Sequence, residues 1–189
     1  MTTIDHDLMD DVAEVLITQE EIKDRTRDLA QQITADYKDI EDLLLICVLK
    51  GAFIFLADLS RQLKRPHCLD FMGVSSYGAG TVSSGAVRIV MDLKEDIAGR
   101  HVLIVEDIID SGHTLEYLLR SLQARSPASI RICSLLSKPS RREVDVPFDY
   151  VGFEIPDEFV VGYGLDFGEI YRNLPCIAIL KPEIFSDVN

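Results

Sequence analysis

Short runs of consecutive apolar residues recur along this chain of 189 residues, and polar segments separate them. The runs lie at 43–49, 68–74, 86–93, 101–106, 130–136, 150–155 and 176–180. A run that is apolar throughout is typical of a strand buried on both faces, as in a parallel sheet. The pattern therefore predicts a mostly parallel central sheet whose two faces are both covered.

Three of the intervening segments predict amphipathic helices. Thr18 and Glu21 have the spacing of a capping box, and apolar residues recur on one helical face after them. A second helix is expected over 52–64 and a third over 114–124. Helices that alternate with buried strands indicate an α/β fold. Because no repeat, linker or low-complexity segment interrupts the pattern, we expect a single domain over 1–189.

The charge balance argues against nucleic-acid and membrane-surface partners. The formal net charge is −13 and the sequence pI is about 4.6, so the surface repels phosphate backbones and anionic lipids. An anionic small substrate would need a local binding site that overcomes the repulsion from this acidic surface. A bound metal ion is a plausible source of the positive charge. The chain shows no signal-peptide pattern, and its four scattered cysteines include no C-x-x-C pair. We expect a cytoplasmic protein.

The segment 102–114 carries the most specific chemical pattern. An apolar run ends at Glu106 and Asp107, a third acid follows at Asp110, and Ser111 to Thr114 open the next helix. Ligands of open α/β sheets bind at the carboxyl ends of strands, and free N–H groups at a helix N-terminus suit a phosphate. Carboxylates accept from sugar hydroxyls and bind magnesium. Taken singly, such acids are more often solvated loop residues, but their order here favours a ligand site.

This segment resembles the phosphoribosyl-pyrophosphate signature of the type I phosphoribosyltransferases. The segments 49–51 and 151–166 narrow the resemblance to the bacterial-type hypoxanthine-guanine phosphoribosyltransferases, over about 15–182. The resemblance implies a central sheet with a small hood of terminal segments and a flexible lid loop. It also implies Mg²⁺, the substrates hypoxanthine, guanine and 5-phosphoribosyl 1-pyrophosphate, and a homodimer or homotetramer.

The resemblance assigns the phosphoribosyl half of the substrate to the 106–114 segment. Glu106 and Asp107 would bind the ribose hydroxyls and magnesium, and Asp110 would take a proton from purine N7. The turn that would wrap the 5′-phosphate consists of Ser111, Gly112, His113 and Thr114. His113 could add a pH-dependent positive charge near the 5′-phosphate or simply face water, and we favour the second.

Residues far from this segment would hold the pyrophosphate. Lys50 and Gly51 would line a loop in which the Leu49–Lys50 bond is cis, and Arg172 would also reach the pyrophosphate. Asp166 would bind a second magnesium ion on the pyrophosphate side, beside the residues that bind the purine.

The purine would meet Lys138 at O6, the ring of Phe159 by stacking, and the main chain of Val160. An ammonium group only donates hydrogen bonds, so Lys138 would select a 6-oxo over a 6-amino purine. Without the resemblance, Lys138 would be interpreted as an exposed loop lysine and Phe159 as a core residue. The Gly- and Ser-rich stretch 75–85 would form the lid, with Ser76 and Tyr77 in its working part.

Two alternatives stay open at this stage. A regulator could use the same fold to sense phosphoribosyl pyrophosphate while binding DNA or RNA, although no basic surface or added helix-turn-helix is present in the sequence. The same chemistry could also act on xanthine, and O6 recognition alone does not rank hypoxanthine against guanine.

Overall fold

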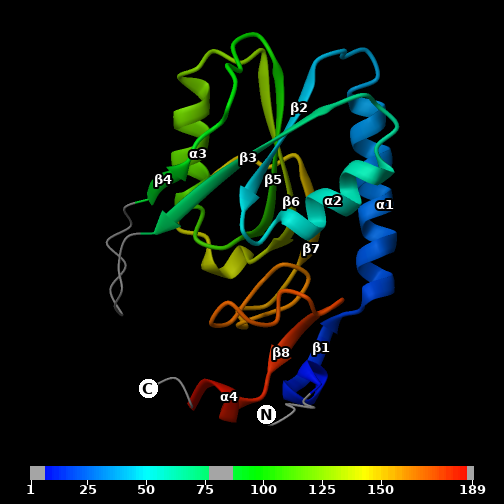
Figure 1. Cartoon of the computed structure of the whole chain (residues 1–189), viewed down its shortest axis with the longest axis vertical. Helices are drawn as coiled ribbons and strands as arrows, with labels where there is room; N and C mark the ends of the chain where they lie inside the picture. Colours follow the sequence, from blue (N-terminus) through cyan, green and yellow to red (C-terminus); the bar gives the residue numbers. More distant parts are fainter. Residues whose placement is uncertain (1–6, 77–86, 187–189) are drawn as a thin grey trace, which may run out of the picture.

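The computed structural model describes residues 7–76 and 87–186, and within them a six-stranded sheet forms the centre of the molecule (Figure 1). Its strands are β2 (Leu43–Leu49), β3 (Cys68–Ser76), β4 (Val87–Met91), β5 (His101–Ile109), β6 (Ser129–Ser137) and β7 (Tyr150–Glu154). The strand order is β4-β3-β2-β5-β6-β7, and every neighbouring pair is parallel except β3 with β4. The predicted mostly parallel sheet is confirmed.

Helices cover both faces of this sheet. α1 (Gln19–Asp36) and α2 (Phe53–Gln62) pack on one face, and α3 (His113–Gln123) packs on the other (Figure 1). The capping box of α1 is formed, because Thr18 Oγ1 accepts from the Glu21 N–H and Glu21 accepts from the Thr18 N–H. The leucines on the inner side of α3 are buried, as their spacing predicts.

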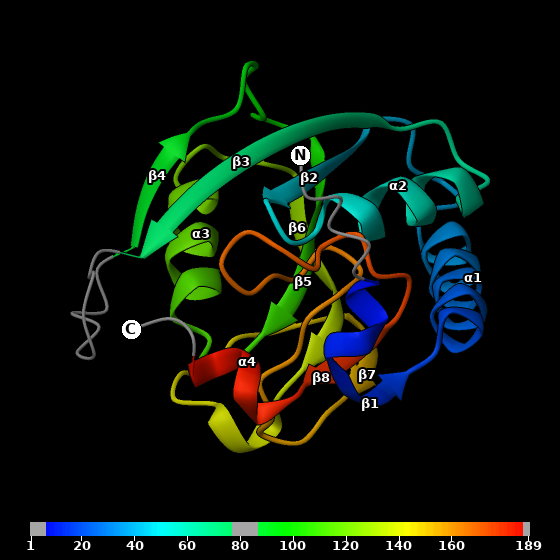
Figure 2. The same cartoon turned by 60° about the horizontal axis from the view of Figure 1, so that its bottom comes forward.

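The two ends of the chain meet in a second, smaller unit that forms the hood. β1 (Val12–Ile17) pairs with β8 (Ile177–Leu180) in an antiparallel ladder. The 3-10 helix η1 (Leu8–Asp11), α4 (Pro182–Ser186) and the long loop between β7 and β8 lie beside this ladder (Figure 2). Tyr171 of this loop donates from its hydroxyl to Asp11 Oδ2 at 2.8 Å. The expected hood of terminal segments is confirmed, and it faces the carboxyl edge of the sheet (Figure 1).

One strand boundary differs from the sequence prediction in a way that affects the site. The apolar pattern predicted that the strand ends at Glu106, but β5 continues to Ile109. Ile108 and Ile109 pair with Leu136 and Ser137 of β6, and this pairing carries the strand past the two acids. Glu106 and Asp107 therefore belong to a strand, and the polar turn begins at Asp110.

The predicted lid falls largely outside the part of the chain that the structure describes. Ser76 is the last residue of β3, and Tyr77 lies outside the described residues. None of the helices within the described ranges is long and apolar enough to cross a membrane.

Candidate active site

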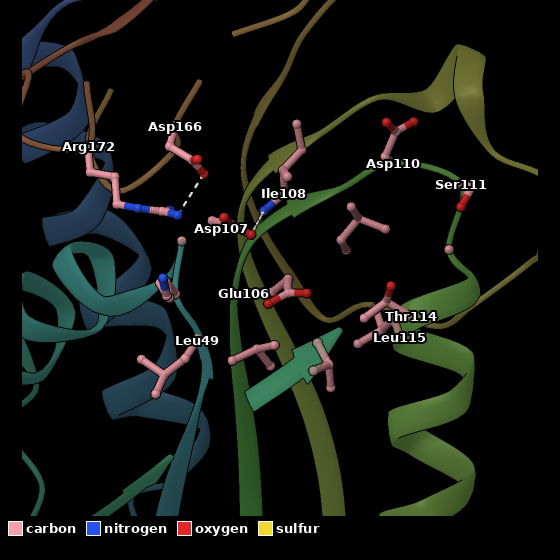
Figure 3. Close-up of a pocket in the computed structure, with 16 residues that line it drawn as sticks. Leu49, Glu106, Asp107, Ile108, Asp110, Ser111, Thr114, Leu115, Asp166 and Arg172 are labelled. Atoms are coloured by element: carbon pink, nitrogen blue, oxygen red, sulfur yellow. Dashed lines mark hydrogen bonds and ion pairs between the residues drawn. The ribbon is translucent and has the colours of Figure 1, made fainter. Parts of the chain in front are cut away.

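A cavity of about 350 Å³ opens at the carboxyl edge of the sheet, under the hood (Figure 3). The predicted site residues that line it are Lys50, Gly51, Glu106, Asp107, Asp110, Ser111, Gly112, Thr114, Asp166 and Arg172. They come from β5, from the segments that follow β2 and β5, and from the hood. Segments more than 100 residues apart are thereby brought to one cavity.

The acid pair of β5 divides between two ends of the cavity. Glu106 is directed toward the first turn of α3, and Asp107 toward Asp166 and Arg172 (Figure 3), as expected for neighbours in a strand. Glu106 is buried, and its Oε2 has no hydrogen-bond partner among the described residues. Burial raises the pKa of Glu106 well above its usual value and raises the pKa of Asp107 to about 6. Asp107 accepts from the Ile108 N–H at 2.7 Å, and this hydrogen bond offsets the effect of burial only in part.

The loop after β2 approaches β5 closely at one glycine. A Cβ built on Gly51 would overlap the carboxylate of Asp107, so any other residue here would force that side chain to move. The Leu49–Lys50 peptide bond is cis, as the resemblance implied. Lys50 lines the cavity, and its Nζ donates to Glu169 Oε2 at 2.8 Å.

The turn between β5 and α3 has the geometry of an anion site. Gly112 is the N-cap of α3 with φ of 96°, and its carbonyl accepts from the Glu116 N–H at 2.9 Å. The N–H groups of the first turn of α3 have no acceptor within the helix, and Thr114 lines the cavity. A Cβ on Gly112 would lie 2.8 Å from the Val144 carbonyl oxygen, so this position also requires glycine. These features suit a phosphate group.

His113 and Asp110, at the two sides of this turn, both pair with charged residues. His113 Nε2 lies 3.0 Å from Glu143 Oε2, and His113 does not line the cavity. Asp110 does line the cavity, and the side chain of Arg141 donates to its carboxylate. Of the two residues, only Asp110 lines the cavity.

Three residues predicted to bind the purine, Lys138, Phe159 and Val160, do not line this cavity. Lys138 follows β6 and is buried, and its main-chain N–H donates to the Ile109 carbonyl at 2.9 Å. Within the described residues, its ammonium group makes no hydrogen bond or ion pair. Val160 is buried, whereas Phe159 is half exposed. Lys138 is thus held next to the turn that begins at Asp110.

Phe159 belongs to an aromatic cluster in the hood. Its ring meets Phe167 at 5.8 Å and Phe185 at 5.6 Å between centroids, in both cases edge to face. Phe167 and Phe185 also contact each other, at 5.0 Å. Phe185 lies in α4, so the C-terminal segment supports the ring that was predicted to stack on the purine.

The far end of the cavity contains a charged group around Arg172. Its Nη2 lies 2.8 Å from Asp166 Oδ1 and 3.2 Å from Glu169 Oε2, and its Nη1 donates to the Gly164 carbonyl at 2.8 Å. The charges and hydrogen bonds of Lys50 and Arg172 lower the pKa of Glu169. The sequence analysis did not identify Glu169. Its spacing of three residues from both Asp166 and Arg172 was the only signal available.

Comparisons with known proteins agree with this geometry. The model of the phosphoribosyl transferase domain family matches residues 14–168. A hypoxanthine-guanine phosphoribosyltransferase of Mycobacterium avium is 52% identical over 180 residues, which cover 93% of this chain and 89% of that protein. The chain belongs to the hypoxanthine-guanine phosphoribosyltransferase family.

Two further members of this family extend the comparison. A hypoxanthine phosphoribosyltransferase of Salmonella typhimurium is 54% identical over 170 residues, which cover 89% of this chain and 96% of that protein. The crystal structure of a hypoxanthine phosphoribosyltransferase from Staphylococcus aureus, 45% identical, superposes with a TM-score of 0.91. It covers 97% of this chain and 100% of the other. As a phosphoribosyltransferase, the chain is an enzyme with a mostly parallel sheet, and the sequence-based expectation of this family is confirmed.

Proposed function

We propose that this chain transfers the 5-phosphoribosyl group of 5-phosphoribosyl 1-pyrophosphate to hypoxanthine or guanine, forming IMP or GMP and pyrophosphate. One observation carries the proposal: a single cavity joins an acid pair, a phosphate-binding turn and a cationic far end. These groups match, in order, a sugar diol, a 5′-phosphate and a pyrophosphate. The family relationship favours this transferase over a regulator that binds nucleic acid.

The acid pair of β5 fits a magnesium ion. Glu106 and Asp107 offer hard oxygen ligands, and a cation would offset the cost that raises the pKa of both carboxyls. The described residues contain no cluster of three potential metal ligands. Magnesium commonly takes one or two carboxylates and completes its shell with substrate oxygens and water, so two acids suffice. When bound, the ion would supply positive charge to the sugar and the leaving group, and Asp166 would serve a second ion.

Asp110 is the proposed general base. N9 of the purine attacks the anomeric carbon, the bond from that carbon to the pyrophosphate oxygen breaks, and the N7 proton passes to the Asp110 carboxylate. The first turn of α3 would hold the 5′-phosphate, and Lys50, Gly51 and Arg172 would bind the departing pyrophosphate. Oriented positive groups at the leaving group lower the barrier most where water is excluded.

Three residues outside the lining of the cavity would select the base. The ammonium of Lys138 would donate to O6, Phe159 would stack on the purine ring, and the main chain of Val160 would contact it. The lid residues Ser76 and Tyr77 would close over the substrates and exclude water. We further propose that the enzyme acts in the cytoplasm as a homodimer or homotetramer, a state that light scattering coupled to gel filtration measures directly.

A steady-state assay tests the proposed reaction. Purified protein with magnesium and phosphoribosyl pyrophosphate should convert hypoxanthine, guanine or both to nucleotide, and adenine should be a poor substrate. Xanthine belongs in the same assay because it also carries an O6 acceptor. Absence of nucleotide from all these bases, together with sequence-specific retardation of DNA or RNA in a gel, would instead support a regulator.

A further inference from the structure

Glu169 connects the two cationic side chains that are proposed to hold pyrophosphate. Its Oε2 lies 2.8 Å from Lys50 Nζ and 3.2 Å from Arg172 Nη2. The two cations come from distant parts of the chain, one from the loop after β2 and the other from the hood. A carboxylate of the protein thus occupies the partners that an anionic leaving group needs.

The backbone at Glu169 adopts a conformation that favours glycine. Residues 167–170 form a tight turn, in which Phe167 and Ile170 exchange main-chain hydrogen bonds of 3.1 and 3.2 Å. Gly168 and Glu169, the two central residues, have φ of 60° and 68°. Such a turn normally takes glycine at the second central position, where a side chain is disfavoured. The N–H of Glu169 donates to Asp166 Oδ2 at 2.9 Å, which fixes the turn beside the cavity.

The two ion pairs of Glu169 are of the kind that a stronger anion displaces. Lys50 and Glu169 are both 64% exposed, and an ion pair in solvent is individually weak. Arg172 is only 19% exposed and keeps two other partners, Asp166 and the Gly164 carbonyl. Loss of the Glu169 contact therefore leaves Arg172 in place and frees Lys50 to pair with a ligand.

We propose that Glu169 is a positioning residue, which holds Lys50 and Arg172 in the ligand-free site and competes with pyrophosphate for them. The proposal rests on the proposed function, which assigns the two cations to the pyrophosphate. Phosphoribosyl pyrophosphate displaces the Glu169 carboxylate when it binds, and the carboxylate returns as pyrophosphate leaves. Glu169 thereby limits inhibition by the product at the cost of some affinity for the substrate.

The variant Glu169→Gln tests this competition, because it removes the charge and keeps the side-chain size. Inhibition by pyrophosphate in the presence of magnesium is measured against phosphoribosyl pyrophosphate. Loss of the two ion pairs of Glu169 should lower the inhibition constant by roughly 3- to 10-fold. The KM for phosphoribosyl pyrophosphate should fall in parallel, while the KM for hypoxanthine stays unchanged. Glu41→Gln is the matched control, since Glu41 is exposed before β2, at the opposite edge of the sheet.

A second variant separates charge from backbone conformation. Glu169→Gly also removes the carboxylate and relieves the disfavoured φ, so it should lower the inhibition constant as Glu169→Gln does. It should in addition raise the melting temperature by about 2–4 °C. If the inhibition constant falls in Glu169→Gly but not in Glu169→Gln, the effect comes from the backbone conformation and the proposal is wrong.

Two further outcomes would also contradict it. An unchanged constant in Glu169→Gln would show that Glu169 does not compete, and a raised one would show that Glu169 assists pyrophosphate binding. Calorimetric titration with magnesium and pyrophosphate gives the same comparison without turnover. If the wild-type protein forms no nucleotide, the proposed function is wrong. If the wild type is active and Glu169→Gln has the same inhibition constant for pyrophosphate, only the proposed role of Glu169 is wrong.

Discussion

The guanidinium of Arg141 lies beside the carboxylate of Asp110, with 3.2 Å between Arg141 Nε and Asp110 Oδ1. Arg141 also lies 3.7 Å from Asp157, and the neighbouring Asp110 raises the pKa of Arg141. Because Arg141 and Asp110 are both about half exposed, their ion pair contributes little to stability. The proposed general base is therefore held by a weak contact that an incoming purine can exchange for its own N7 proton.

Asp110→Asn should lower turnover by roughly 10²- to 10⁴-fold, the usual contribution of a general base. An amide keeps the shape of the side chain but accepts a proton poorly, so binding of phosphoribosyl pyrophosphate should change little. Pre-steady-state kinetics and calorimetry measure the two quantities separately. Arg141→Gln is the companion variant, and its turnover should stay within a few-fold of wild type. Full turnover in Asp110→Asn where chemistry limits the rate would refute the base role.

Lys138→Gln should reduce kcat/KM for hypoxanthine by about 10- to 100-fold, the typical loss when a hydrogen bond from a charged donor is removed. The KM for phosphoribosyl pyrophosphate should not change. Discrimination against adenine should also weaken, because a glutamine side chain can accept a hydrogen bond as well as donate one. Lys38→Gln, at an exposed lysine after α1, is the control. If kcat/KM falls equally for hypoxanthine and for phosphoribosyl pyrophosphate, Lys138 has a structural role instead.

Phe185→Ala should raise the KM for the purine several-fold, because it removes one of the two rings that support Phe159. Each aromatic pair contributes about 0.5–1.5 kcal/mol, so the free energy of unfolding should fall by about 1–3 kcal/mol. Phe71→Ala is a matched control, since Phe71 on β3 is 38% exposed and Phe185 is 37% exposed. In a background that already carries Phe159→Ala, the KM effect of Phe185→Ala should disappear. If Phe185→Ala still raises the KM in the Phe159→Ala background, α4 does not act on the purine site through Phe159.

The stability of the ligand-free protein should depend on pH through Asp107. Its pKa is raised to about 6 in the folded state, above the usual 3.8, so the folded state favours the protonated carboxyl. This contribution to stability is complete below about pH 4 and is lost as the pH rises through 6. Asp107→Asn should therefore match wild type near pH 4 and exceed it at pH 7 by about 3 kcal/mol.

Denaturant unfolding at several pH values, with a chelator present to exclude metal, checks this pH dependence. Asp39→Asn, at an exposed residue after α1, should show no such pH-dependent difference. A stability difference for Asp107→Asn that is constant across the pH range would show that the carboxyl of Asp107 is not perturbed by burial.

Some tertiary features could not be predicted from local patterns. β1 contains Glu14 between apolar residues that are largely exposed, and it becomes a strand through pairing with β8, some 160 residues later. The extension of β5 to Ile109 likewise depends on pairing with β6. Two adjacent acids are typical of a strand end in isolation, whereas here the neighbouring strand continues past them.

The sequence by itself determined the strands of the central sheet, the helices α1 to α3 and the chemistry of the 106–114 segment. Apolar periodicity, capping spacing and residue type are local properties that act over a few residues. Only the tertiary structure decided that Glu169 joins Lys50 to Arg172, that Arg141 holds Asp110, and that Phe185 supports Phe159. Each of these contacts depends on the path of the chain between two distant segments, and that path is set by packing of the whole sheet and hood.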